Sequence, residues 1–267
     1  MFNFDTETKP NINTFYKDIG IKLPIQVYLP ENFSEDKKYK AVIAIHGGAW
    51  AAFKETPDSW DGGTMRHMAM YFRDKGLVGI VFSYRDIKFN ETTDISDLIE
   101  DCNDALKFIK ENYKFIDFEN IVFSGDSAGG HLALSLAMDL TLKEGVAISP
   151  KAVLAYNPVT KCNCKLWGFC GIDEKHRKDA SPIDNVKKIK PSILLMHGLS
   201  DTVVTIDDSR EFYSKMKALE NDIEMIEREN EKHAFIIYGY TAPPENVKED
   251  YRISEEYLLK KIKNLYD

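Results

Sequence analysis

The sequence predicts an α/β fold with a mostly parallel central sheet and helices on both sheet faces, on the strength of three observations. Short, continuous apolar runs recur along the chain, as in strands that are covered on both faces. Segments with apolar residues at helical spacing lie between these runs. No stretch rich in Pro, Gly or Ser divides the 267 residues, so we expect one domain over residues 1–267.

The strands can be placed from these apolar runs. The central strands are expected at Ala41–Ile45, Leu77–Phe82, Ile121–Phe123, Ala152–Tyr156 and Ser192–Met196. Another strand is predicted before them over residues 21–29, where Ile, Leu and Val alternate with other residues in the period of a half-buried strand. Pro24 has no amide hydrogen for a sheet ladder, which indicates an edge or near-edge strand.

Helices and two longer connections fill the remaining chain. Helical stripes are expected at Met65–Phe72, Leu98–Ile109, Leu132–Leu140, Phe212–Leu219 and Ile253–Leu265. Residues 50–63 and 157–190 do not fit the alternation, and each stretch follows the carboxyl end of a predicted strand. Ligands of open α/β sheets bind at that edge, so both stretches are expected to border a pocket, with 157–190 as a substrate-side loop insertion.

Composition and charge narrow the class of protein. The net charge of −8 and the pI near 5.4 argue against nucleic acid or an anionic membrane surface as partner, because both favour clustered Lys and Arg. The amino terminus lacks a basic segment followed by an apolar one, and no apolar run approaches the length of a membrane span. These features predict a cytoplasmic protein that is not embedded in a membrane.

The four cysteines raise the question of a metal. Cys102 falls on the apolar face of a predicted helix and is expected to be a buried thiol. Cys162, Cys164 and Cys170 crowd together shortly before His176, a set that could suit tetrahedral zinc. Their spacing departs from the usual CxxC knuckle, so free thiols in a loop are the favoured interpretation, and we expect no metal and no cofactor.

A candidate nucleophile stands between two glycines at a predicted strand-to-helix turn. In Gly125-Asp-Ser-Ala-Gly129 the serine is Ser127, directly after an apolar run and directly before a helical pattern. A turn this tight forces the serine into an unfavourable backbone conformation and leaves room for neighbouring segments only at the glycines. The motif alone also occurs by chance, so the interpretation depends on partners for Ser127.

A serine hydroxyl needs a base, and the base needs a carboxylate that orients it. Of the six histidines, only His233 follows both the serine and a strand-end acid, in a loop before the last helix. Asp201 lies just past a buried strand, whereas Asp207 and Asp208 have the position of helix-start residues. The predicted triad is therefore Ser127, Asp201 and His233, in the chain order of an α/β hydrolase.

A further segment could stabilise the negative oxygen that forms when a carbonyl is attacked. An apolar strand leads into His46-Gly-Gly-Ala-Trp50, where the absence of side chains lets backbone amides face a ligand. A glycine turn alone would be weak evidence. About eighty residues before a GxSxG motif, it becomes a strong candidate for an oxyanion hole.

With these motifs in place, the chain resembles α/β-hydrolase esterases of the hormone-sensitive-lipase-like and acetyl-xylan or feruloyl esterase group. The resemblance rests on His46–Trp50, Ser83–Arg85, Gly125–Gly130, the Asp201 segment and His233, and it spans nearly the whole chain. It implies that the amides of Gly48, Ala49 and Ala128 form the oxyanion hole. It also implies a buried pairing role for Arg85.

Two features bear on the substrate that the resemblance implies. Ala49 stands where the family often has a third glycine, which leaves the subfamily open, and the few residues before the first predicted strand imply a small cap or none. An open pocket favours short acyl groups, so the expected reaction is hydrolysis of acetyl esters, with carbohydrate as the expected alcohol. Trp50, Trp60 and Trp167 lie in or beside the two long loops and could stack on sugar or phenolic rings, or could simply fill the core.

Other functions within the same fold stay open at this point. A feruloyl esterase and an arylformamidase are the nearest alternatives. A peptidase of this fold normally carries an extra domain, for which the length leaves no room, and a binding protein of this fold normally lacks the serine or the histidine. The expected partner is a small-molecule or oligosaccharide ester, and the sequence does not predict an oligomeric state.

Overall fold

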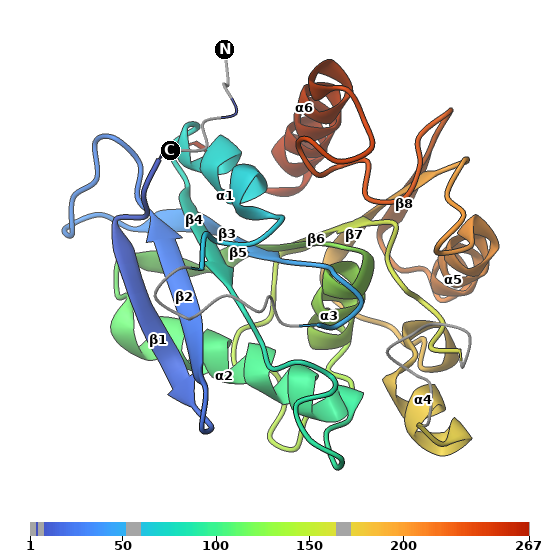
Figure 1. The fold of residues 1–267 in the computed structure, drawn as a ribbon. Coiled ribbons are helices and arrows are strands. Elements are labelled where there is room, and N and C mark those ends of the chain that lie inside the picture. The colour runs from blue at the N-terminus through green and yellow to red at the C-terminus, as the bar shows by residue number, and fades with distance from the viewer. Residues whose placement is uncertain (1–3, 5–7, 52–59, 164–171, 267) are drawn as a thin grey trace.

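The computed structural model describes residues 4, 8–51, 60–163 and 172–266. In these ranges the strands form one eight-stranded sheet in the order β1-β2-β4-β3-β5-β6-β7-β8 (Figure 1). The strands are β1 (Ile12–Asp18), β2 (Lys22–Tyr28), β3 (Tyr39–Ile45), β4 (Val78–Phe82), β5 (Ile116–Asp126), β6 (Ala152–Tyr156), β7 (Ser192–Gly198) and β8 (Ile223–Arg228). The six strands β3 to β8 pair in parallel with one another. β1 pairs antiparallel to β2, and β2 pairs antiparallel to β4.

All five predicted central strands are confirmed as β3 to β7, and the prediction for β2 is partly confirmed. β2 is the second strand from the edge, as Pro24 indicated, but it is buried on both faces rather than on one. Its polar Gln26 is buried because the side-chain amide donates to the carbonyl of Trp60 (2.7 Å) and the carbonyl accepts from the Tyr28 hydroxyl (3.0 Å). The edge strands β1 and β8 were not predicted; both are only partly buried.

Helices cover both faces of the sheet, as the sequence predicted (Figure 1). One apolar cluster includes side chains of α2 (Ile95–Asn112), α3 (Ser127–Ala137) and α5 (Ile206–Ala218). A second cluster, on the opposite face, includes side chains of α1 (Arg66–Arg73) and α6 (Pro244–Lys261). None of the helices in the described ranges has both the length and the apolar character needed to cross a bilayer.

The segment 157–190 contains structure that the sequence did not predict. Its described part holds α4 (Glu174–Ala180) and a 3₁₀ helix at Pro182–Asp184, which lies against α3. Asp173 caps α4 by accepting a hydrogen bond from the amide of His176 (3.0 Å). The end of this segment therefore lies against the helix that follows the predicted nucleophile.

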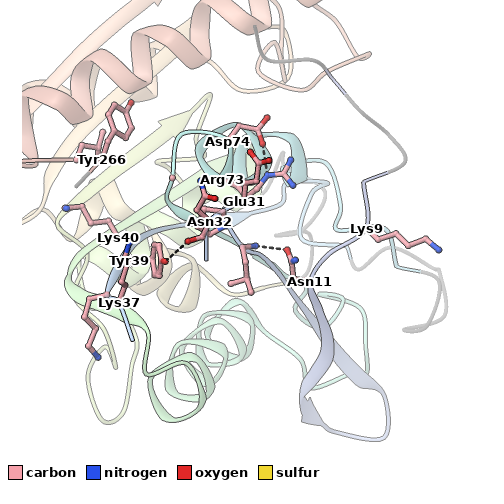
Figure 2. A pocket seen from close by; sticks show the side chains of 15 residues that line it. Lys9, Asn11, Glu31, Asn32, Lys37, Tyr39, Lys40, Arg73, Asp74 and Tyr266 are labelled. Carbon is pink, nitrogen blue, oxygen red and sulfur yellow. Dashed lines mark hydrogen bonds and ion pairs between the residues drawn. The ribbon is translucent and has the colours of Figure 1, made fainter. Parts of the chain in front are cut away.

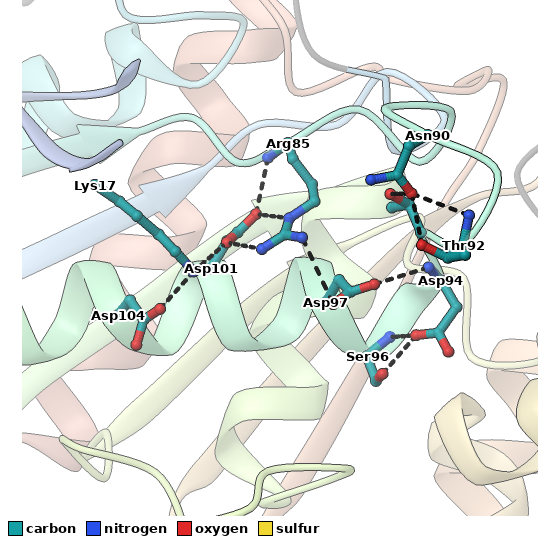
Figure 3. A network of polar contacts seen from close by, with 10 residues as sticks. Lys17, Arg85, Asn90, Thr92, Asp94, Ser96, Asp97, Asp101 and Asp104 are labelled. Atoms are coloured by element: carbon teal, nitrogen blue, oxygen red, sulfur yellow. Dashed lines mark hydrogen bonds and ion pairs between the residues drawn. The ribbon is translucent and has the colours of Figure 1, made fainter. Parts of the chain in front are cut away.

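A buried ionic network anchors the chain that follows β4 (Figure 3). The carboxylate of Asp101 on α2 is fully buried and accepts from Nε and Nη2 of Arg85 (2.6 and 2.7 Å) and from Nζ of Lys17 (2.6 Å). The Arg85 backbone amide also donates to it (3.1 Å). The pairing role expected for Arg85 is confirmed, but its side chain is only partly buried. The network fixes the residue that follows Tyr84, whose hydroxyl donates to the carbonyl of His46 (2.8 Å).

We expect Asp101→Asn to lower the free energy of unfolding by about 3 kcal/mol, because the change leaves two cations without their buried partner. The matched control is Asp104→Asn, which removes the other carboxylate of Lys17; Asp104 is 32% exposed, so its loss should cost about 1 kcal/mol or less. Urea unfolding at pH 7 measures both differences. Equal losses in the two variants would contradict the anchoring role of Asp101.

Candidate active site

The predicted nucleophile lies on a strained turn between β5 and α3. β5 ends at Asp126 and α3 begins at Ser127, whose φ of 50° is in the left-handed region. A β-carbon on Gly125 would lie 2.3 Å from the carbonyl oxygen of Gly129, and one on Gly129 would lie 2.1 Å from that of Ile45. Only glycine fits at either position. The left-handed backbone of Ser127 is the unfavourable conformation that the sequence predicted for this residue.

The three side chains of the predicted triad form one chain of hydrogen bonds. His233 Nε2 lies 2.9 Å from Ser127 Oγ, and His233 Nδ1 lies 2.7 Å from Asp201 Oδ2. An ionised carboxylate can only accept, so Nδ1 carries the proton and Nε2 is left to accept from the serine hydroxyl. This is the arrangement that lets an imidazole take a proton from the serine.

Close backbone packing brings the acid and the base together. Asp201 follows β7 and His233 follows β8. A β-carbon on Gly198 would lie 2.3 Å from the carbonyl oxygen of Glu231, and the same oxygen accepts from the Ser200 amide (2.9 Å). The two loops therefore touch just before the residues that pair.

The environment of Asp201 keeps its carboxylate charged. The side chain is fully buried, and the amides of Val203 and Val204 donate to Oδ1 (2.8 and 2.9 Å). Burial alone would raise the pKa of Asp201, but hydrogen bonds from His197 and His233 outweigh it and hold the pKa well below its usual range. A charged carboxylate at this position stabilises the protonated form of the base.

His197 is a site residue that sequence reasoning did not single out. Its Nε2 lies 3.3 Å from Asp201 Oδ2 and 3.1 Å from the carbonyl of Val204. Its Nδ1 lies 2.9 Å from the Ser209 hydroxyl. The sequence feature that could have identified His197 is its position near the end of a strand, four residues before Asp201.

The candidate oxyanion loop turns sharply at three consecutive residues. Gly48, Ala49 and Trp50 have φ values of 94°, 56° and 59°, all in the left-handed region. The Gly47 amide donates to Asp126 Oδ1 (3.0 Å), so the loop is tied to the residue directly before Ser127. Ala128 lies in the first turn of α3, where backbone amides have no acceptor within the helix.

Asp126 braces these two segments. Its carboxylate is buried, and burial raises the pKa of Asp126 to about 6 despite the amide hydrogen bond from Gly47. A β-carbon on Gly47 would lie 2.7 Å from Asp126 Oδ2. The contact therefore requires glycine at position 47 and gives Asp126 a supporting place in the site.

The tryptophans do not have the exposed rings that stacking on a substrate needs. Trp50 is 2% exposed and Trp60 is 5% exposed, so the packing alternative describes both, because hydrophobic neighbours enclose their rings. Trp167 lies outside the described residues. We therefore correct the sequence-based expectation of a stacking surface at Trp50 and Trp60.

The candidate zinc ligands can be followed only in part. Cys162 is buried, and its Sγ lies 3.4 Å from Nε2 of His131. His176 is exposed on α4 and pairs with Asp173, and Cys164 and Cys170 lie outside the described residues. Within the described part of the chain, no three His, Cys, Asp or Glu side chains are grouped so as to hold a metal ion.

Figure 2 shows the residues that line a hollow of about 860 Å³. It is lined by residues at the start of β3, at the end of α1 and near the carboxyl terminus, among them Tyr39, Arg73 and Tyr266. Ser127 lies at the carboxyl end of β5, which is parallel to β3, so the hollow lies at the opposite end of these strands. It is therefore separate from the candidate active site.

Comparison with known proteins places the chain among α/β hydrolases. The family model described as the prolyl oligopeptidase family matches residues 90–265. The chain belongs to the prolyl oligopeptidase family. This match includes all three residues of the hydrogen-bonded triad, and a second family model, BD-FAE, matches residues 25–146, which include Ser127.

Individual relatives of this prolyl oligopeptidase family member include peptidases and esterases. It is 33% identical over 132 residues to a probable dipeptidyl-peptidase 5 of Aspergillus terreus, with 46% of this chain and 17% of that protein covered. It is 32% identical over 124 residues to esterase LipU of Mycobacterium tuberculosis, with 46% of this chain and 37% of that protein covered. The chain thus spans well under half of either relative.

A solved structure matches the fold over the whole chain. Thermogutta terrifontis esterase 2 in its apo form superposes with a TM-score of 0.79 at 21% identity, covering 100% of this chain and 99% of that one. At this identity the likeness shows the fold alone. The predicted α/β-hydrolase fold is thereby confirmed.

We expect acid to destabilise the oxyanion loop through His46. Burial lowers the pKa of His46 to about 4, while an unfolded histidine titrates near about 6.5. The stabilisation from neutral His46 is therefore complete above the unfolded pKa and is lost as pH falls from about 6.5 towards 4, by up to about 1.4 kcal/mol per pH unit. His46→Gln removes this titration, so its unfolding free energy should fall less steeply.

Urea unfolding between pH 7.5 and 4.5 provides the measurement, with the slope against pH compared between wild type and His46→Gln. Other titrating groups, such as Asp126, are present in both proteins and cancel in the difference. Parallel slopes would show that His46 is not a buried neutral imidazole.

Proposed function

We propose that this protein is a serine carboxylesterase that acts through an acyl-enzyme on Ser127. The observation that carries the proposal is the hydrogen-bonded chain Ser127–His233–Asp201, next to a loop whose backbone contacts the nucleophile turn. The ionised, buried Asp201 orients the base, and the left-handed Ser127 presents its hydroxyl at the end of β5. Esterases among the relatives support the same reaction class.

The reaction proceeds in two halves. Ser127 Oγ attacks the ester carbonyl carbon while its proton passes to His233 Nε2, and the negative carbonyl oxygen is received by the amides of Gly48, Ala49 and Ala128. The bond to the alcohol breaks as His233 returns the proton to the departing oxygen, which leaves the acyl group on Ser127. Water then gives a proton to His233, attacks the acyl carbon and releases the acid, and Ser127 regains its proton.

Short acyl groups are the proposed substrates, with acetyl as the preferred one. Thermogutta terrifontis esterase 2 has been solved with propionate and with butyrate bound, and a rabbit relative, 28% identical over 134 residues, is an arylacetamide deacetylase. A carbohydrate alcohol rests on the resemblance to acetyl-xylan esterases alone, because the rings of Trp50 and Trp60 are buried. Feruloyl and formamide substrates remain alternatives.

Peptide hydrolysis is the second candidate. The prolyl oligopeptidase family match and the 33% identity to a dipeptidyl-peptidase favour it. The same triad and oxyanion donors would serve an amide carbonyl, with an amine as the leaving group. The substrate experiment below distinguishes the two candidates.

We expect Ser127→Ala to fold normally and to lose at least about 10³-fold in kcat on p-nitrophenyl acetate, because no other group can form the acyl-enzyme. Asp201→Asn should retain a small residual activity, since the serine and the base remain. Paraoxon should add one diethylphosphoryl group to wild type, located by mass spectrometry at Ser127, as the Thermogutta esterase has been solved phosphorylated by that compound. Retention of most activity in Ser127→Ala would rule out the proposed nucleophile.

We expect kcat/KM for p-nitrophenyl acetate to exceed that for the butyrate and octanoate esters, by about 10-fold for the longest chain. The same assay should include acetylated xylo-oligosaccharides, methyl ferulate, N-formylkynurenine and a dipeptidyl p-nitroanilide. Faster cleavage of the anilide than of every ester would favour the peptidase. Preference for butyrate or longer chains would contradict the short-acyl proposal.

A further inference from the structure

The candidate oxyanion loop contains two consecutive residues whose backbone conformation must be imposed by their surroundings. Ala49 and Trp50 are both left-handed, a conformation that residues with a side chain rarely adopt. Backbone hydrogen bonds hold part of the turn: the Ala51 amide donates to the Gly48 carbonyl (3.0 Å), and the Ile87 amide donates to the Trp50 carbonyl (2.9 Å). A further restraint on the turn comes from the indole of Trp50.

His131 receives that indole. Trp50 Nε1 donates to His131 Nδ1 at 3.3 Å, and the two rings meet edge to face with centroids 5.5 Å apart. On the other side of the imidazole, His131 Nε2 lies 2.8 Å from the carbonyl oxygen of Ala180. His131 is fully buried on α3, about one helical turn after Ser127.

The partners of His131 determine its protonation. A carbonyl can only accept, so Nε2 carries the proton, and an indole N–H can only donate, so Nδ1 must be unprotonated. Burial lowers the pKa of His131 to about 4, which keeps the imidazole neutral at pH 7. The nearby Cys162 thiol, 3.4 Å from Nε2, is also neutral because burial raises its pKa.

We propose that His131 is a positioning residue for the oxyanion loop. It holds Trp50 in place, and through Trp50 it fixes the backbone amides of Gly48 and Ala49 relative to Ser127. The proposal rests on the proposed function and specifies how that site is assembled. Ser127 and His131 lie on the same helix, so the loop is fixed relative to the nucleophile itself. Ala180 in turn braces the imidazole, which connects the 157–190 segment to the loop.

A displaced oxyanion loop stabilises the transition state less while binding the ground state almost as before. Complete loss of one oxyanion donor typically costs about 10² to 10³ in kcat. Loosening the loop should cost less, so we expect a fall in kcat of about 10- to 100-fold with KM changed by no more than about twofold.

Three substitutions separate the two hydrogen bonds of the imidazole. His131→Gln can place an amide N–H near the former Nε2 and so still donate to Ala180, but it offers Trp50 no acceptor at the former Nδ1. His131→Asn can place its amide oxygen near the former Nδ1 and so still accept from Trp50. Trp50→Phe keeps an aromatic ring in the core, although a smaller one, and removes the N–H donor.

The assay measures kcat and KM for p-nitrophenyl acetate and the inhibition constant of phenylboronic acid, which forms a tetrahedral adduct with an active-site serine. His131→Gln and Trp50→Phe should each lower kcat and weaken phenylboronate by the same 10- to 100-fold factor, and the double variant should be no worse than the poorer single one. His131→Asn should restore kcat to within about threefold of wild type.

Asn103→Ala is the matched control for a purely structural loss. Asn103 is fully buried on α2 and makes two hydrogen bonds, from Nδ2 to the Gly145 carbonyl (3.1 Å) and from the Ala147 amide to its Oδ1 (2.8 Å). Neither partner belongs to the site, so Asn103→Ala should lower Tm and leave kcat unchanged. If His131→Gln and Trp50→Phe behave like this control, the positioning role is wrong.

Two further readouts separate failure of this inference from failure of the proposed function. Nitrogen NMR of the His131 imidazole at pH 7 should show Nε2 protonated and Nδ1 unprotonated in wild type. The Nδ1 signal should shift in Trp50→Phe. Observation of the opposite tautomer would overturn the inference independently of any activity measurement. Ser127→Ala is assayed in parallel. If it is inactive while His131→Gln keeps wild-type kcat, only the positioning role fails, and if it stays active, both proposals fail.

Discussion

The close approach of the first turn of α3 to the end of β3 is the constraint on which the rest of the site depends. The Gly129 α-carbon lies against the carbonyl of Ile45 with no room for a side chain, and this contact sets the Ser127 turn beside the loop that begins at His46. Asp126 reinforces it by holding the Gly47 amide. The candidate oxyanion donors and the candidate nucleophile therefore share one closely packed junction, which favours the pre-organised geometry that oxyanion stabilisation needs.

Around this junction, two buried carboxylates have pKa values shifted in opposite directions, because their hydrogen-bond partners oppose the effect of burial to different extents. Asp201 accepts two backbone amides and lies against two imidazoles, so it stays charged despite its burial. Asp126 has fewer compensating donors, and its pKa rises. The charged carboxylate accepts from His233, on which the proposed reaction would place a positive charge, whereas Asp126 accepts from the backbone amide of Gly47.

The sequence predicted what depends on local pattern and chain order. The five central strands are continuous apolar runs, and the order of Ser127, Asp201 and His233 follows from where strands end, so both could be predicted. The edge strands β1 and β8 could not, because they are only partly buried and carry too many polar residues to form such runs. The burial of Trp50 could not be predicted either. Its partner His131 is 81 residues away in the sequence, and the two side chains meet only because α3 packs on the sheet.

Three buried histidines each contact a different part of the site. Because these contacts occupy their ring nitrogens, only one histidine near the site, His233, has the geometry of a base. His46 contacts Ser83 at the start of the oxyanion loop, His131 holds Trp50 at the end of that loop, and His197 contacts Asp201. Both nitrogens of each ring have protein partners within the fold, so none can offer a free lone pair to Ser127. His233 differs because its Nε2 faces the serine and its side chain is partly exposed, as the proposed proton transfer to a leaving group requires.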